Sequence, residues 1–168
     1  MVPALYLLRH AKSSWADASL SDHDRPLAPR GRRDASRIAK HLPRLGCEPN
    51  LVLCSSALRT RETFELVEPA LGKASVLFEE ALYGATADDL LACINVVPDA
   101  VDSLMLIGHN PGLQELALDL ASSGDDLGRL ESKFPTAAVA TLALAKTWSH
   151  VGPGDAVLAD YVVPKQLR

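Results

Sequence analysis

Short apolar runs recur along the chain, and each of them ends abruptly at polar residues. Continuous apolar runs of this length are typical of strands that are buried on both faces of a sheet. Two further runs near the end of the chain flank a Gly-Pro-Gly turn and predict two more strands. The expected strands cover residues 4–8, 51–54, 75–78, 103–107, 137–145 and 156–163.

Apolar residues spaced three or four positions apart predict helices between these strands. The clearest stripe stops before Gly46, and glycine suits a helix end because it readily adopts the left-handed conformation. Its apolar positions are Ala35, Ile38, Ala39, Leu42 and Leu45. A second stripe follows Asn110 and Pro111, which are favourable as the N-cap and the first residue of a helix.

Capping residues indicate two further helices. Ser56 is expected to cap a helix that begins near Leu58. Thr86 with Asp89 resembles a capping box at the start of another helix, with aspartate in the usual place of glutamate. Strands and helices therefore alternate along most of the chain.

This alternation predicts an α/β fold, a three-layer sandwich in which a mostly parallel sheet is covered by helices on both faces. No linker or repeat interrupts the pattern, so residues 1–168 are expected to form a single domain. Long polar loops are expected at residues 9–27 and 122–134. A long loop in a compact domain is often functional.

The composition excludes several classes of protein. Of the 168 residues, 48% are hydrophobic and 23% are charged, as is ordinary for a globular domain. The net charge of −4 argues against a protein that coats nucleic acid. No apolar stretch approaches the roughly 20 residues of a membrane span, and the N-terminal residues lack the pattern of a signal peptide. We therefore expect a cytoplasmic protein whose partners are neither nucleic acid nor a membrane.

Polar residues of compatible chemistry follow four of the expected strands. They are Arg9 and His10 after the first, Arg59 after the second, Glu80 after the third and His109 after the fourth. Ligands of open α/β sheets bind beyond the carboxyl ends of the strands, so these side chains are expected to meet at one edge. Arginine forks match phosphate oxygens, and helix N-termini add positive potential. The pattern predicts an anion site that contains a nucleophile.

Two alternative sites fit part of this pattern. His10, His109 and Glu80 could ligate zinc, but the neighbouring arginines would repel a cation. Cys54 followed by Arg59 is similar to the phosphate loop of a cysteine phosphatase, although that loop needs one more intervening residue and a glycine. The three cysteines are odd in number and lack a Cys-x-x-Cys pair, so neither a disulfide framework nor a zinc ribbon is expected.

The residues at these strand ends resemble the motifs of a known family. Residues 8–15, with their Arg-His-Ala-Lys-Ser core, resemble the opening motif of the histidine phosphatase superfamily, whose fold is phosphoglycerate-mutase-like. With alanine in place of the commoner glycine, this core resembles that of the SixA-type phosphohistidine phosphatase branch. Further matching segments follow in order at residues 24–31, 55–60, 80–84 and 108–112. From residue 121 onward no motif is recognised.

The resemblance implies a role for each residue at the strand ends. His10 would be the nucleophile, whose imidazole attacks phosphorus to form a covalent phosphohistidine. Arg9, Arg59 and His109 would hold the phosphoryl oxygens and stabilise the charge of the transition state. Glu80 would stand where mutase relatives carry their proton donor. Neither a metal nor a cofactor would be needed, because fixed cations take that role.

Two further implications concern the substrate. Ser13 and Arg25 lie within matching segments and would contact it. Mutases of this fold are generally longer and insert lid-forming helices between the third and fourth strands, where this chain has only residues 79–102. A short connection implies an open pocket, which favours hydrolysis over a mutase reaction that must exclude water.

These features predict a phosphatase that hydrolyses phosphohistidine in a signalling or phosphotransfer protein through an intermediate on His10. One alternative is a phosphatase for small phosphoesters or nucleotides. Another is a non-catalytic module that binds phosphoproteins, although such a module would need no nucleophile. The partner would thus be a phosphorylated protein or a small phosphorylated metabolite. The sequence leaves the oligomeric state open.

Overall fold

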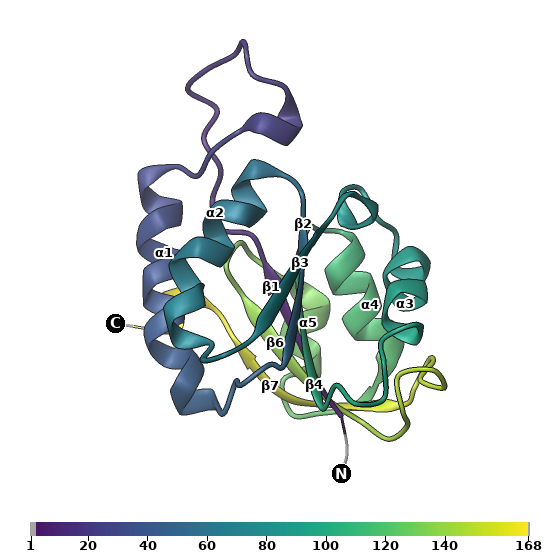
Figure 1. The fold of residues 1–168 in the computed structure, drawn as a ribbon. Helices are drawn as coiled ribbons and strands as arrows, with labels where there is room; N and C mark the ends of the chain where they lie inside the picture. The colour runs from purple at the N-terminus through teal and green to yellow at the C-terminus, as the bar shows by residue number, and fades with distance from the viewer. Residues whose placement is uncertain (1–2, 168) are drawn as a thin grey trace.

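The chain is built around one seven-stranded sheet, which a computed structural model describes for residues 3–167 (Figure 1). The strands lie in the order β3-β2-β4-β1-β6-β7-β5. β6 runs antiparallel to both of its neighbours, whereas the other neighbouring pairs are parallel. The strands are β1 (Ala4–Arg9), β2 (Leu51–Ser55), β3 (Ser75–Glu79), β4 (Ser103–Gly108), β5 (Ala121–Ser123), β6 (Val139–Leu144) and β7 (Ala156–Val162).

Helices cover both faces of this sheet, which confirms the expected three-layer architecture (Figure 1). Leu5 and Leu7 of β1 belong to one core with α3, α4 and α5, whereas Tyr6 and Leu8 belong to the other core with α1 and α2. Alternate residues of a strand point to opposite faces, so one apolar run serves both cores. The helices are α1 (Pro29–His41), α2 (Leu58–Val67), α3 (Ala87–Asn95), α4 (Gly112–Leu120) and α5 (Leu127–Ser132).

Two of the expected helix ends are confirmed. α1 continues as a short 3₁₀ helix, Leu42–Leu45, and stops at Gly46, whose φ of 68° is left-handed. At the start of α3, the Thr86 side chain accepts a hydrogen bond from the Asp89 backbone, and the Asp89 side chain accepts one from the Thr86 backbone. This capping box satisfies two backbone donors that the first turn of a helix leaves without partners.

Several expectations about single elements are wrong. β3 is an edge strand and is not buried on both faces, since Leu77 is 50% exposed. The expected polar loop at residues 122–134 instead contains most of β5 and all of α5. Ser56 does not cap α2, and Asn110 is not the N-cap of α4; those positions are taken by Ala57 and Pro111. The capping residues predicted both helices correctly, but each N-cap lies one residue later than expected.

The loop between β1 and α1 projects beyond the end of the sheet (Figure 1). Its base is closed by backbone hydrogen bonds from Ser14 N–H to the Pro26 carbonyl, 2.8 Å, and from Ala28 N–H to the Lys12 carbonyl, 2.9 Å. Near its end it forms a short 3₁₀ helix, Asp22–Asp24. The loop, residues 10–28, is therefore fixed at its base by backbone hydrogen bonds directly after β1.

Gly31 allows the first turn of α1 to pack against the backbone of this loop at Lys12. A Cβ atom at Gly31 would lie 2.1 Å from the Lys12 carbonyl oxygen, far inside van der Waals contact. The same carbonyl accepts the Ala28 N–H at 2.9 Å, so it cannot retreat without breaking that bond. Only glycine fits at this crossing of two backbones.

We predict that Gly31→Ala lowers the free energy of unfolding by about 1–3 kcal/mol, because the added methyl group overpacks the crossing. Gly128→Ala in α5 is the matched control, since a Cβ there meets nothing within 4 Å. It is expected to leave stability unchanged or raise it by up to about 1 kcal/mol, because alanine is the better helix former. Urea denaturation of both variants tests the difference, and equal stabilities would contradict it.

Candidate active site

The register between β1 and β4 brings two histidines together beyond the carboxyl ends of the strands. Arg9, the last residue of β1, is paired with Gly108, the last residue of β4. His10 and His109 follow directly, and their ring centroids lie 5.3 Å apart. The structure thus confirms that these strand ends meet, as the sequence predicts.

His10 is buried and neutral. Its Nδ1 lies 2.7 Å from the Ala11 carbonyl oxygen, an acceptor, so in the neutral ring Nδ1 carries the proton and Nε2 carries the lone pair. Burial, with smaller contributions from His109, Arg59 and Arg9, lowers the pKa of His10 to about 3, against the opposing effect of the Ala11 hydrogen bond. At neutral pH the ring is therefore uncharged, and its Nε2 is unprotonated.

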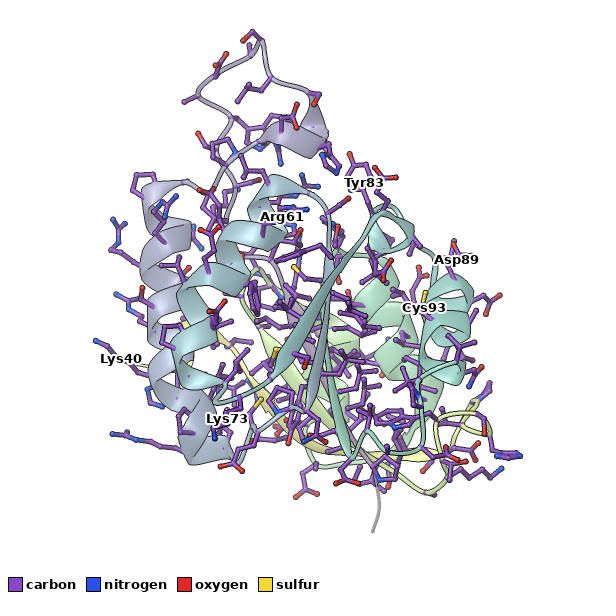
Figure 2. The ribbon with its side chains drawn as sticks, viewed as in Figure 1. Lys40, Arg61, Lys73, Tyr83, Asp89 and Cys93 are labelled. Atoms are coloured by element: carbon purple, nitrogen blue, oxygen red, sulfur yellow. The ribbon has the colours of Figure 1, made fainter. Side chains whose placement is uncertain are left out.

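His109 is held beside it by a hydrogen bond. Its Nε2 lies 2.7 Å from the Ser55 hydroxyl oxygen at the end of β2. Burial and, second to it, the Arg59 guanidinium lower the pKa of His109 to about 4. The ring of Tyr83 packs against His109 edge-on with centroids 5.5 Å apart, and Figure 2 shows Tyr83 at this end of the molecule.

Two guanidinium groups supply the positive charge of the site. Arg9 donates from Nη1 to the Phe134 carbonyl at 3.0 Å, and its pKa is lowered by burial and by Arg59. The Nε groups of Arg9 and Arg59 are buried, and neither has a hydrogen-bond partner among residues 3–167. Like charges repel at close range, so an anion between the two groups would relieve the repulsion. The four residues Arg9, His10, Arg59 and His109 form what we call the histidine-arginine cluster.

Asp22, which the sequence analysis did not single out, binds this cluster from the projecting loop. Arg59 donates from Nη1 to the Asp22 carbonyl at 2.7 Å and from Nη2 to its carboxylate at 3.1 Å. The Tyr83 hydroxyl donates to the same carboxylate at 2.6 Å. The Tyr83 hydrogen bond and the Arg59 charge lower the pKa of Asp22, which keeps it ionised. Asp22 also lies 3.5 Å from Arg25, three residues along the loop, but this local spacing gave no signal that Asp22 would reach Arg59.

His23, in the same loop, is a second residue that the sequence analysis did not single out. Its Nε2 lies 2.9 Å from the Ser56 hydroxyl, and its ring packs edge-on against Tyr83 with centroids 4.8 Å apart. The Ser56 side chain, expected to cap a helix, makes this contact instead. The 3₁₀ turn of the loop thus closes one side of the cluster.

Ser13 and Arg25, the predicted substrate contacts, lie next to each other in the same loop. Arg25 is 6% exposed and donates from Nη2 to the Ser13 hydroxyl at 2.5 Å. Its guanidinium carbon lies 3.4 Å from the ring centroid of Trp15, which is itself 71% exposed. Arg25 therefore links the loop to the cluster through Asp22.

Glu80 is the one predicted catalytic residue without a contact to the cluster. It begins a short 3₁₀ helix after β3 and is exposed. Among residues 3–167 its side chain makes neither a hydrogen bond nor an ion pair, and its backbone carbonyl accepts the Tyr83 N–H at 3.0 Å. Its role as proton donor stays a prediction.

Within residues 3–167 no group of three or more His, Cys, Asp or Glu side chains is placed to hold a metal ion. In the same residues no helix combines the length and apolar character needed to cross a membrane.

Comparison with known proteins places this geometry in context. A model of the histidine phosphatase superfamily (branch 1) matches residues 5–86. An uncharacterized protein of Mycobacterium tuberculosis strain H37Rv is 41% identical over 162 residues, which cover 94% of this chain and 100% of that protein. The similarity therefore extends over nearly the whole chain.

Solved structures show the same architecture. A candidate phosphohistidine phosphatase SixA from Agrobacterium tumefaciens is 30% identical, with a TM-score of 0.84, over 98% of this chain and 99% of that one. The protein histidine phosphatase SixA in complex with tungstate is 26% identical, with a TM-score of 0.75, over 98% and 99% of the two chains. The phosphoglycerate-mutase-like α/β fold expected from the sequence is thereby confirmed.

The two depressed histidine pKa values predict how stability depends on pH. In the unfolded chain both rings have pKa values near 6.5, so between about pH 6.5 and pH 4 the unfolded state binds protons that the folded state does not. The free energy of unfolding must therefore fall as the pH is lowered through this window. His109→Gln is expected to flatten the slope there, as measured by urea denaturation at several pH values. His41→Gln in α1 is the control, and an unchanged slope in His109→Gln would contradict the prediction.

Proposed function

The chain belongs to the histidine phosphatase superfamily, in its SixA-type branch, and is a phosphatase, and we propose that it hydrolyses phosphohistidine in a signalling or phosphotransfer protein. The observation that carries this proposal is the state of His10. Its Nδ1 proton is held by the Ala11 carbonyl, and its Nε2 lone pair is free among fixed positive charges. That is what a nitrogen nucleophile for phosphorus requires.

In the first step, His10 Nε2 forms a bond to phosphorus while the P–N bond of the substrate breaks. The departing imidazole keeps that electron pair, and with a proton on its other nitrogen it leaves as neutral histidine. The phosphorylated His10 ring carries its positive charge next to the Ala11 carbonyl, which accepts its Nδ1 proton at 2.7 Å. The hydrogen bond therefore stabilises the intermediate.

In the second step, water attacks the phosphoryl group and the bond to His10 breaks. Because Nδ1 keeps its proton throughout, His10 leaves as a neutral imidazole and the enzyme returns to its starting state. Orthophosphate takes up the oxygen and the protons of the water. Neither step needs a redox change.

Arg9, Arg59 and His109 hold the phosphoryl oxygens in this proposal. Charge that spreads over these oxygens in the transition state is stabilised by donors fixed in advance. An incoming anion also favours protonation of His109, since a nearby negative charge raises a histidine pKa. Ser13 and Arg25 contact the substrate beside the phosphoryl group.

The carboxyl groups near the cluster favour a substrate whose leaving group departs without being protonated by the enzyme. Asp22 is kept ionised by Tyr83 and Arg59, so it has no proton to donate at neutral pH. Glu80, which we propose as the proton donor for less reactive substrates, is exposed and makes no side-chain contact with the cluster. A protonated phosphohistidine needs no such donor, because its leaving group is already neutral.

We predict that His10→Ala lowers kcat by about a thousandfold or more, because it removes the nucleophile. The variant should stay folded, as measured by circular dichroism, and should form no phosphoenzyme in rapid-quench labelling. His41→Ala, which removes a histidine of α1 outside the cluster, should retain full activity. Near-normal hydrolysis by folded His10→Ala would rule out the proposed nucleophile.

A substrate panel tests the proposed preference. We expect kcat/KM for a phosphohistidine-containing protein to exceed that for phosphoglycerate or sugar phosphates by about tenfold or more, since one order of magnitude needs only about 1.4 kcal/mol of transition-state stabilisation. Glu80→Gln should lower activity on the phosphoesters more than on phosphohistidine. Faster turnover of a phosphoester or nucleotide would favour the alternative of a small-molecule phosphatase.

A further inference from the structure

A hollow lined mainly by basic side chains lies next to the active site, although the chain as a whole carries a negative net charge. Its volume is about 660 Å³, and it is open to solvent between α1 and α5. The end of β7 and a short 3₁₀ helix, Pro164–Gln166, form its floor. We call it the basic groove; its charged lining residues are Arg30, Asp34, Arg37, Arg129, Lys133 and Lys165.

The basic groove holds more positive charge than its own carboxylates neutralise. Asp34 is buried and lies 3.7 Å from the Arg30 side chain and 3.5 Å from the Arg37 side chain. Arg129 is paired with Asp126 at 2.8 Å. Within residues 3–167, the exposed Lys133 and Lys165 side chains make no ion pair, although the chain as a whole has a net charge of −4.

One segment forms the wall between the basic groove and the histidine-arginine cluster. Pro135 and Thr136 line the groove. The preceding carbonyl, that of Phe134, accepts the Arg9 guanidinium at 3.0 Å, and the Ala137 N–H donates to the carbonyls of Arg9 and His10 at 3.1 Å. A ligand in the groove would therefore lie directly behind the backbone that holds Arg9.

The sheet also places both sites at the same edge. Val162 of β7 is paired with Val139 of β6, which is paired with Leu8 of β1. β7 runs parallel to β1, so both strands end where His10 lies, two strands apart. A single macromolecule that presents a phosphoryl group to His10 can thus reach the basic groove across a short distance of surface.

We propose that the basic groove binds an acidic segment of the phosphorylated protein whose phosphohistidine enters the active site. The proposal rests on the proposed function, since it assumes a protein substrate. Its cations would pair with carboxylates, and its apolar floor of Val163 and Pro164 would take the apolar side chains between them. Complementary charge mainly speeds association and selects partners, and its effect weakens as salt increases.

The first test compares two double variants on two substrates. Lys133→Glu with Lys165→Glu reverses two groove charges whose side chains make no described hydrogen bond or ion pair. Lys40→Glu with Lys73→Glu is the matched control, and Figure 2 shows both lysines away from the end at which Tyr83 lies. The substrates are an acidic phosphohistidine-containing protein and the phosphoramidate ion.

We expect the groove variant to lower kcat/KM on the acidic phosphoprotein about tenfold at low salt, with the loss shrinking at high salt. Its activity on phosphoramidate should stay unchanged, and the control variant should behave as wild type on both substrates. Three results would overturn the proposal: an equal loss on both substrates, an equal loss in the control variant, or no loss on the phosphoprotein.

A binding measurement tests whether the basic groove binds an acidic peptide, even if no phosphoprotein is hydrolysed. A fluorescent peptide of consecutive glutamates is titrated with each protein, and its anisotropy reports binding. The proposal expects binding by wild type and by the control variant, and an affinity about tenfold lower for the groove variant. Absence of wild-type binding, or tighter competition by a nucleoside triphosphate than by the peptide, would overturn it. Phosphoramidate hydrolysis without phosphoprotein hydrolysis would count only against the proposed function.

Discussion

The parallel pairing of β1 with β4 is the constraint on which the site depends. It sets Arg9 opposite Gly108, so that His10 and His109 leave the sheet side by side. Two guanidinium groups could not lie beside a protonated histidine pair without strong repulsion, and burial together with the arginine charges keeps both rings neutral. One backbone register thus places an unprotonated histidine pair next to two guanidinium groups that can attract an anion.

The fold could be predicted because its signals are local or follow from general packing rules. The strand runs, the end of α1 at Gly46 and the capping box at Thr86 all depend on neighbouring residues. The order of the strands in the sheet does not, so the exposure of β3 at the edge could not be predicted from its apolar sequence. β5 is too short to produce a recognisable pattern and exists because β7 offers it a partner.

The candidate site divides in the same way. Residues at strand ends could be placed together from the sequence, because parallel strands end at one edge of a sheet. Asp22 and His23 could not, since their positions depend on how a long loop folds back onto Arg59 and Tyr83. The basic groove could not be predicted either, because its charges come from three separate parts of the chain, at residues 30–37, 129–133 and 165.

The stacking of Trp15 on Arg25 has an optical consequence. The chain has two tryptophans, and the other, Trp148, is 1% exposed with its indole N–H bonded to the Val101 carbonyl. Trp15 instead lies 71% exposed above a guanidinium that is linked through Asp22 to Arg59. An anion that displaced Asp22 from these arginines would change the surroundings of Trp15 and leave those of Trp148 unchanged, so we expect Trp15 fluorescence to respond when the active site is occupied.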